Sequence, residues 1–401
     1  MDLRSVAPAP PDAILGLTEA FKKDPRPEKI NLGVGVFMDD AGRTPVLATV
    51  KQAEEDLQRE ETTKSYLPIA GLPAYGERVA ELVFGPGHEV VRSGRVRMAQ
   101  SPGGTGALRI GAEFLRKFLP SSKAWLSAPT WPNHKGVFAA AGFGAADYPY
   151  YDPSSRGLAF GKMAEMLDGA PENDVVVLHV CCHNPTGVDL SADQWREVAA
   201  IAARRRWIPF FDFAYQGFGA GLEADRAGLL PFLETGLPVL VAASFSKNFG
   251  LYNERTGALA LVASDPGEAA AWLTHVQALV RVLYSNPPAH GAAIVARILA
   301  DPSERAAWEG EVDAMRGRIV SVRDALVQGL RARGVPVDFS FIRRQRGMFS
   351  FSGLTDAQVA FLREKKAIYM VGGGRINVAG ITPRNLDYLC DSVAEVLRAV
   401  P

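Results

Sequence analysis

Four short apolar segments, rich in β-branched and aromatic residues, constrain the fold of this chain most. They are DVVVLHV, WIPFFDF, PVLVAASF and GALALVA, at residues 174–180, 207–213, 238–245 and 257–263. None of them alternates apolar and polar residues, as strands with one solvated face do, so each predicts a strand that is covered on both sides. Strands of this kind belong to a sheet that lies between two layers of helices.

Helical patterns separate these segments. SADQWREVAAIAARR follows the turn NPTGVDL and begins with Ser191, a good helix N-cap, and GALRIGAEFLRKFL follows a cluster of glycines. The alternation of strands and helices predicts an α/β fold, with a mostly parallel sheet in a large domain over about residues 45–314.

The C-terminal part of the chain has a different pattern. A long helical pattern begins near Asp301 and leads into a segment of mixed helix and strand that contains QRGMFSFSGL and GGGRINVAG. We expect a smaller α+β domain formed by residues 12–44 and 315–401. Residues 1–11, rich in proline and alanine, are expected to form an extended arm, and such arms often lie across a partner subunit.

Composition excludes several classes of protein. The 401 residues carry 44 basic and 44 acidic side chains, without the basic excess typical of proteins that bind nucleic acid or membrane surfaces. No apolar run approaches the roughly 20 residues of a membrane span, and the N-terminus lacks the apolar core of a secretory signal. Cys181 and Cys182 are adjacent in an apolar run and Cys390 is alone, which does not suggest a disulfide framework. We expect a cytoplasmic protein.

Lys247 raises the question of function, because it follows the apolar segment PVLVAASF within SFSKNFGLYNER. The carboxyl ends of parallel strands are where α/β sheets bind their ligands. A single lysine at a strand end is usually only a solvated side chain, so its meaning depends on the residues that accompany it.

A glycine-rich segment, SPGGTGALRIG at residues 101–111, is the first of these. It opens a helix, whose N–H groups and positive dipole end attract phosphate, and Thr105 adds a hydroxyl donor. No clear strand precedes it and the G-x-G-x-x-G spacing is absent, which argues against dinucleotide binding. Taken alone, the glycines could simply form a turn.

Asp212 and Asn184 are the next two. Asp212 lies in the middle of the aromatic strand FFDFAYQGF, where a buried carboxylate needs a permanent cationic partner. A protonated pyridine nitrogen or a structural salt bridge would both meet that need. Asn184, in CCHNPTGVD, lies in a tight turn after a strand, and turn chemistry alone could explain it.

Together these features match what pyridoxal 5'-phosphate requires: a lysine for covalent attachment, a carboxylate for the ring nitrogen, a donor to the ring oxygen and a phosphate cradle. Six segments follow one another along the chain in this order: GGTGAL, PTWPNH, HNPTG, DFAYQGF, SKNFGLYNER and SNPPAHG. In these segments and in their order the chain closely resembles, from end to end, the fold-type I, class I aminotransferases of the aspartate/aromatic subgroup.

The resemblance implies a role for each matching residue. Lys247 would hold the cofactor, Asp212 would pair with its ring nitrogen, and Asn184 and Tyr215 would bond its ring oxygen O3′. Lys247, Asp212 and Tyr215 would be the catalytic residues. The remaining cofactor contacts would come from Gly104, Thr105, Ser244, Ser246, Arg255 and the stacking ring of Trp131, with Tyr66 reaching the phosphate across a dimer interface. His134 and His179 would support Asp212, and no metal is expected.

Two arginines would select the substrate. By resemblance, Arg375 would hold the α-carboxylate, and Arg281 would reach from the neighbouring subunit to the distal carboxylate of a dicarboxylic amino acid. Gly35, Trp131 and Asn184 would also contact the substrate. The resemblance therefore implies a homodimer with shared active sites, acting on amino acids and 2-oxo acids.

The expected reaction is a ping-pong transfer of the amino group from L-aspartate to 2-oxoglutarate, with activity on aromatic amino acids besides. Met38, Leu283 and Ser65 depart from the aspartate pattern, whereas Asn286 keeps it. These departures leave an aromatic aminotransferase, acting mainly on phenylalanine or tyrosine, as the alternative. A β-lyase or β-decarboxylase of the same fold, and a binding or regulatory module that keeps the fold, are more distant alternatives.

Overall fold

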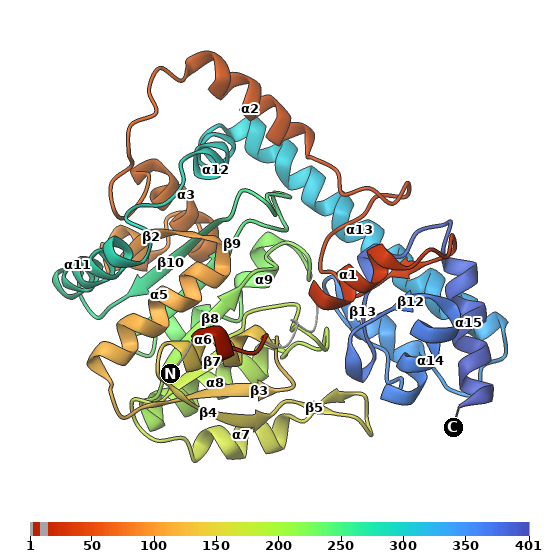
Figure 1. The fold of residues 1–401 in the computed structure, drawn as a ribbon. Coiled ribbons are helices and arrows are strands. Elements are labelled where there is room, and N and C mark those ends of the chain that lie inside the picture. Colours follow the sequence, from red (N-terminus) through yellow and green to blue (C-terminus); the bar gives the residue numbers. More distant parts are fainter. Residues whose placement is uncertain (1–2, 9–14, 401) are drawn as a thin grey trace. The chain divides into compact units, whose positions relative to one another are not determined.

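The computed structural model describes residues 3–8 and 15–400, which form two compact units (Figure 1). The first unit comprises Met1–Arg43, Val320–Arg344 and Met348–Pro401, and the second comprises Thr44–Ile319 and Gln345–Gly347. The sequence predicts domain boundaries near residues 44 and 314, and the two units divide after Arg43 and after Ile319. Of the expected N-terminal arm, residues 1–2 and 9–11 lie outside the described residues, and the 3-10 turn η1 (Leu3–Ser5) lies within them.

A seven-stranded sheet forms the centre of the second unit. In spatial order its strands are β2 (Val96–Pro102), β10 (Thr256–Val262), β9 (Val239–Ser244), β8 (Ile208–Phe213), β7 (Val175–His179), β3 (Lys123–Ala128) and β4 (Gly144–Pro149). Four of the six neighbouring pairs are parallel, and β10 is antiparallel to both of its neighbours. The sheet is therefore mostly parallel, as predicted.

Helices surround this sheet. They are α2 (Ala48–Glu60), α3 (Pro73–Phe84), α4 (Glu89–Arg92), α5 (Gly103–Phe118), α6 (Asn133–Ala140), α7 (Phe160–Asp168), α8 (Ala192–Arg205), α9 (Leu222–Arg226), α10 (Leu230–Leu233), α11 (Pro266–Leu283) and α12 (His290–Ala300). The hairpin of β5 (Tyr151–Asp152) and β6 (Gly157–Leu158) also belongs to this unit. Helix α13 (Pro302–Ala332) contains the boundary with the first unit.

Adjacent residues of β8 show that helices cover both faces of the sheet. The ring of Phe210 packs edge-on against Phe138 of α6, while the ring of Phe211 packs against Trp195 of α8 and Phe232 of α10. Both phenylalanines are fully buried. A strand with two buried faces has no reason to alternate polar and apolar residues, which explains the continuous apolar runs in the sequence.

The first unit is an α+β arrangement. Its elements are α1 (Leu15–Lys23), β1 (Ile30–Asn31), η2 (Ser340–Arg344), β11 (Phe349–Phe351), α14 (Asp356–Lys366), β12 (Ile368–Tyr369), η3 (Gly372–Gly374), β13 (Arg375–Asn377), η4 (Val378–Gly380) and α15 (Leu386–Ala399). Strand β1 pairs with β12 in parallel and β11 with β13 in antiparallel fashion. The predicted fold class, an α/β protein with a smaller α+β part, is confirmed.

Two details of the sequence interpretation were wrong. Strand β2 runs directly into α5, although no strand was expected before the glycine-rich segment. Its sequence, VRMAQSP, mixes polar and apolar residues because β2 is an edge strand with only one neighbour. Asp212 lies at the carboxyl end of β8 and not in its middle. Ser191, in contrast, caps α8 as predicted and forms a reciprocal capping box with Gln194.

Candidate active site

Asp212 is the central carboxylate of the second unit. It is buried at the end of β8, where it lies opposite His179, the last residue of β7. His134 Nε2 lies 3.0 Å from an Asp212 carboxylate oxygen, and Thr130 Oγ1 lies 2.8 Å from His134 Nδ1. Burial acts to raise the pKa of Asp212, but the hydrogen bond from His134 and the charge interaction with that ring, followed by those with His179 and Lys247, outweigh it and lower that pKa. Asp212 is therefore held as an anion.

Lys247 lies three residues beyond the end of β9, within the field of this anion. Its Nζ atom is 5.0 Å from the centre of the Tyr215 ring. Desolvation lowers the pKa of Lys247 from 10.5 to about 8; the carboxylate of Asp212 acts against this shift and the charge of Arg255 adds to it. A substantial share of the amine is thus neutral near physiological pH, as nucleophilic attack on a carbonyl requires.

Asn184 and Tyr215 approach each other beside the lysine. The Asn184 side-chain amide donates to the Tyr215 hydroxyl oxygen across 3.4 Å. Trp131 precedes α6 and presents its ring at right angles to His134, with 5.3 Å between the ring centres. The residues predicted to surround the cofactor ring are thus gathered at the carboxyl ends of β7 and β8 and at the start of α6.

An anion cradle lies where α5 begins. A Cβ atom built on Gly103 would meet Arg255 Nη2 at 2.5 Å, and one built on Gly104 would meet the Ser244 Cβ at 3.0 Å. Arg255 Nη1 lies 3.5 Å from Ser246 Oγ, which in turn lies 3.3 Å from Ser244 Oγ. A guanidinium, two hydroxyls and the first N–H groups of a 16-residue helix thus converge on one place. This donor set suits phosphate.

Thr105 lies in the first turn of α5, beside these glycines. The donors of the cradle therefore come from the start of α5, the chain just after β9 and Arg255 ahead of β10. Each is a loop or terminus at the edge of the sheet, where side chains can face a ligand without disturbing the apolar core.

The absence of a side chain at Gly257 lets the start of α5 and the end of β9 lie close to β10. A Cβ atom there would lie 2.4 Å from the Gly103 carbonyl carbon and 2.8 Å from the Ala243 carbonyl oxygen, and neither backbone group can yield easily. We expect Gly257→Ala to destabilise the protein by about 1–3 kcal/mol and to displace the start of α5. Thermal melting measures the first effect, and affinity for added pyridoxal phosphate measures the second.

Gly161→Ala is the matched control for this substitution, because nothing lies within 4 Å of the added methyl group there. Its melting temperature and cofactor affinity are expected to stay at the values of the unaltered protein. Equal behaviour of the two variants would contradict the close approach at Gly257.

The first unit holds the remaining predicted substrate residues, Arg375 and Gly35. Arg375 is buried, donates from Nη2 to the carbonyl oxygen of Gly33 across 2.6 Å, and lies over the Phe349 ring at 4.4 Å. The same ring closely approaches Gly35, where a Cβ atom would meet it at 2.7 Å. The first unit thus brings Arg375 and Gly35 to one phenylalanine.

Tyr66 and Arg281 are the predicted residues that lie apart from the Lys247 cluster. Tyr66 is 91% exposed, and Arg281 is exposed near the end of α11, where it bonds the Ser285 hydroxyl. Neither of these side chains contacts Lys247 or Asp212 within the described chain. This is the arrangement expected of residues that act on a neighbouring subunit.

Two residues that support the site were missed in the sequence. Thr130 orients His134, as described above. Asp189 accepts hydrogen bonds from the backbone N–H groups of Cys182 and His183, at 2.8 and 2.9 Å, and so fixes the turn that carries Asn184. Burial raises the pKa of Asp189 to about 6, against the effect of these two bonds. Its position, five residues after Asn184 in HNPTGVD, is the only signal that the sequence offered.

Comparison with known proteins places the chain in a family. It matches the model for aminotransferase class I and II over residues 27–393. It is 51% identical over 389 residues to an aspartate aminotransferase of Haemophilus influenzae, which covers 97% of this chain and 98% of that one. It is 46% identical over 391 residues to an aromatic-amino-acid aminotransferase of Pseudomonas aeruginosa, covering 98% of each.

A solved structure agrees with these relatives. The aromatic-amino-acid aminotransferase from Burkholderia pseudomallei, covalently bound to pyridoxal phosphate, superposes with a TM-score of 0.96 at 49% identity, over 99% of this chain and all of that one. The chain therefore belongs to the class I and II aminotransferases and is an enzyme of that family, as its sequence predicted. No helix of the described ranges is both long enough and apolar enough to span a bilayer.

Proposed function

We propose that this enzyme is a pyridoxal-phosphate-dependent aspartate aminotransferase, which transfers the amino group of L-aspartate to 2-oxoglutarate and yields oxaloacetate and L-glutamate. The observation that carries the proposal is the pairing of a lysine of lowered pKa with a buried, ionised aspartate, Lys247 with Asp212, beside an anion cradle. The relatives named aspartate aminotransferase, at about 50% identity, support the choice of substrate.

The described residues fit the cofactor. Pyridoxal phosphate supplies an aldehyde that captures amines and a ring that withdraws electrons when its nitrogen is protonated. Lys247 would hold it covalently, and the Asp212 carboxylate would accept a hydrogen bond from the ring N–H. Asn184 and Tyr215 would donate to its ring oxygen, and the ring of Trp131 would stack against it.

The remaining cofactor residues would hold the phosphate. They are Gly104, Thr105, Ser244, Ser246 and Arg255, with Tyr66 of a second subunit. With its pKa lowered to about 8, the Lys247 side chain would supply a neutral amine that could accept the proton from the substrate Cα and pass it to the cofactor. His134 and His179 would keep Asp212 charged.

The two arginines would recognise a dicarboxylic substrate. Arg375 would hold the α-carboxylate through a bidentate pair. Arg281 of the neighbouring subunit would hold the distal carboxylate, and an apolar side chain would leave that guanidinium without a partner. Gly35, Trp131 and Asn184 would complete the substrate contacts.

A homodimer follows from the same argument. Tyr66 is 91% exposed and Val282, next to Arg281, is 79% exposed, with Leu283 also uncovered. Large apolar side chains gathered at a surface beside residues with an assigned role favour a second subunit there. We propose that this subunit covers them. The cytoplasmic location expected from the sequence stays a prediction.

An aromatic aminotransferase is the second candidate. The 49% identity to the Burkholderia pseudomallei aromatic enzyme is a specific observation in its favour. The apolar residues Met38 and Leu283, in place of the polar ones that the aspartate pattern favours, point in the same direction. Half-reaction rates with aspartate, glutamate, phenylalanine and tyrosine distinguish the two candidates, and we expect aspartate to react fastest.

Arg281→Ala tests the assigned specificity. We expect kcat/KM for aspartate to fall by about 100-fold or more, since one charge-assisted pair is lost, whereas that for phenylalanine changes by less than about tenfold. A loss for aspartate no larger than the loss for phenylalanine would show that Arg281 does not bind the distal carboxylate.

Mixing this variant with Lys247→Ala tests whether the site is shared. In a hybrid dimer one subunit carries Arg281→Ala and the other Lys247→Ala. One of its two sites then keeps both Lys247, from one subunit, and Arg281, from the other. Random reassortment should therefore restore about a quarter of the aspartate activity, because half of the dimers are hybrids with one intact site in two. Activity that stays at the level of the separate variants would contradict the shared site.

A further inference from the structure

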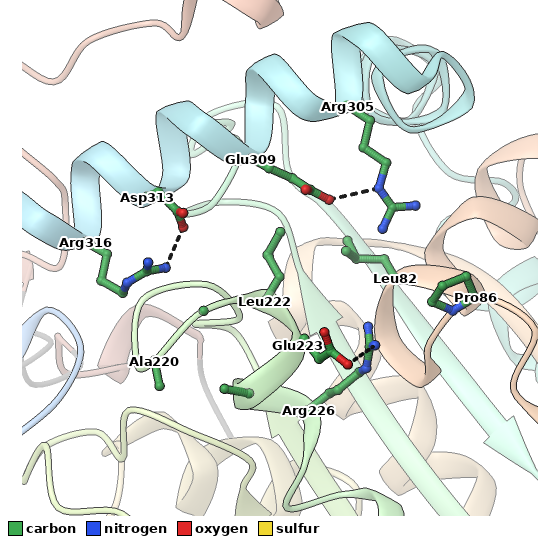
Figure 2. A pocket seen from close by; sticks show the side chains of 12 residues that line it. Leu82, Pro86, Ala220, Leu222, Glu223, Arg226, Arg305, Glu309, Asp313 and Arg316 are labelled. Carbon is green, nitrogen blue, oxygen red and sulfur yellow. Dashed lines mark hydrogen bonds and ion pairs between the residues drawn. The ribbon is translucent and has the colours of Figure 1, made fainter.

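A groove lined by three arginines lies in the second unit, on elements that the proposed reaction does not use. It has a volume of about 620 Å³ and is formed by the end of α3, the segment around α9 and one face of α13 (Figure 2). We name it the arginine groove after Arg226, Arg305 and Arg316. None of the residues assigned to the cofactor or substrate lines it.

The guanidinium of Arg226 has N–H donors that are not used in hydrogen bonds within the described chain. Its side chain is only 13% exposed, yet within the described chain its guanidinium makes no hydrogen bond and has a single ionic partner, Glu223, at 3.7 Å. Glu223 is itself 90% exposed and can turn into solvent without cost. A guanidinium that is largely covered, and whose N–H donors meet no hydrogen-bond acceptor of the described chain, is stabilised by an anion that enters the groove.

Arg305 faces the same space from the opposite side. Figure 2 shows its guanidinium extending from α13 toward the side of the groove that holds Arg226, with the apolar side chain of Leu82 between the two guanidinium groups. Among the described residues only its Nε atom is engaged, with Glu309 at 3.0 Å, so that both terminal nitrogens can bind a ligand.

Arg316 extends the groove by a further guanidinium. It lies eleven residues after Arg305 on the same face of α13, and its Nη1 atom bonds the Gly217 carbonyl and Asp313. The carboxylates of Glu309 and Asp313 are more exposed than the arginines they pair with, so the guanidinium groups lie nearer the floor and the acidic groups nearer the rim.

The charge balance and the size define the ligand. Three arginines and three carboxylates line the groove, so their formal charges cancel, and the groove does not present the basic surface that a nucleic acid requires. The volume is that of a small-molecule site. We propose that the arginine groove binds a small organic anion, whose carboxylate or phosphate groups bridge Arg226 and Arg305 and displace Glu223.

Calorimetric titration of the cofactor-loaded enzyme tests this site, with inorganic phosphate in one arm and tricarballylate, a tricarboxylate, in the other. The arm that binds identifies the acidic group. Arg226→Gln and Arg305→Gln are each expected to weaken binding by about tenfold or more, because each removes one charged donor group. Arg196→Gln, an exposed arginine of α8 with a single acidic neighbour, is the matched control and should bind as the unaltered enzyme does.

Glu223→Gln provides an opposite prediction. It removes the competing carboxylate from an exposed position, so it should tighten binding severalfold and leave folding intact. A purely structural ion pair would give no tighter binding. Binding lost in Arg281→Ala but retained in Arg226→Gln would assign the anion to the substrate site and overturn the proposal, as would no binding in either arm.

Discussion

Replacing Lys247 with alanine is expected to lower kcat by at least about four orders of magnitude and to leave the cofactor bound without a covalent link. The amine is the one group of the site that can both attack an aldehyde and carry a proton, and alanine does neither. The anion cradle around Arg255 is untouched, so pyridoxal phosphate should still bind. Absorption spectra before and after dialysis, with single-turnover rates, measure both effects.

Lys247→Arg separates charge from chemistry. Arginine keeps a cation near Asp212 but remains protonated, so the Lys247→Arg enzyme should be as inactive as the Lys247→Ala enzyme.

Capture of the cofactor by the cofactor-free wild-type protein should rise with pH around a midpoint near 8, because the lowered pKa of Lys247 makes the neutral amine available above that value. A midpoint above 10 would contradict the lowered pKa, and a Lys247→Ala enzyme with ordinary turnover would refute the assignment.

Asp212→Asn is expected to lower kcat by about three orders of magnitude. Asparagine has nearly the same shape and can still accept the hydrogen bond from His134, so the substitution removes little besides the charge. Without that charge the ring nitrogen of the cofactor would lose its proton, and the ring would withdraw electrons poorly. Stopped-flow rates of the aspartate half-reaction provide the measurement.

The control for this substitution is Asp193→Asn, which removes an exposed carboxylate in the first turn of α8 and should leave the rate unchanged. Retention of more than about a tenth of the activity by Asp212→Asn would mean that the carboxylate does not serve the ring nitrogen. Partial rescue by a cofactor analogue with a permanent positive charge on that nitrogen would support the role directly.

The sequence predicted those parts of the fold that depend on local composition. The four buried strands β7, β8, β9 and β10 were visible because a strand between two helical layers is apolar on both faces. Strand β2 was missed because an edge strand carries polar residues such as Arg97 and Gln100, which look like a loop. Pairing across the sheet, with β10 antiparallel inside a parallel set, is a tertiary property that no local pattern carries.

The site could be anticipated to a similar extent. Lys247, Asp212 and Asn184 each lie in or just after an apolar run that predicts a buried strand, and the structure brings them to one edge of the sheet. Asp189 and Thr130 act through other residues, by fixing a backbone turn and a histidine ring, and such support depends on distances that only the folded chain defines. The arginine groove combines α3, α9 and α13, which are far apart in sequence, so no motif announces it.

The proposed function depends on covalent attachment of pyridoxal phosphate to the Lys247 side chain, and borohydride reduction of the loaded enzyme detects that bond. Reduction fixes the carbon–nitrogen bond between lysine and cofactor, and mass spectrometry of the digested protein then locates it. We predict that the added mass lies on Lys247, in the peptide that contains SFSKNFGLYNER. Modification of a different lysine, or of none in a protein saturated with cofactor, would show that Lys247 does not hold the cofactor.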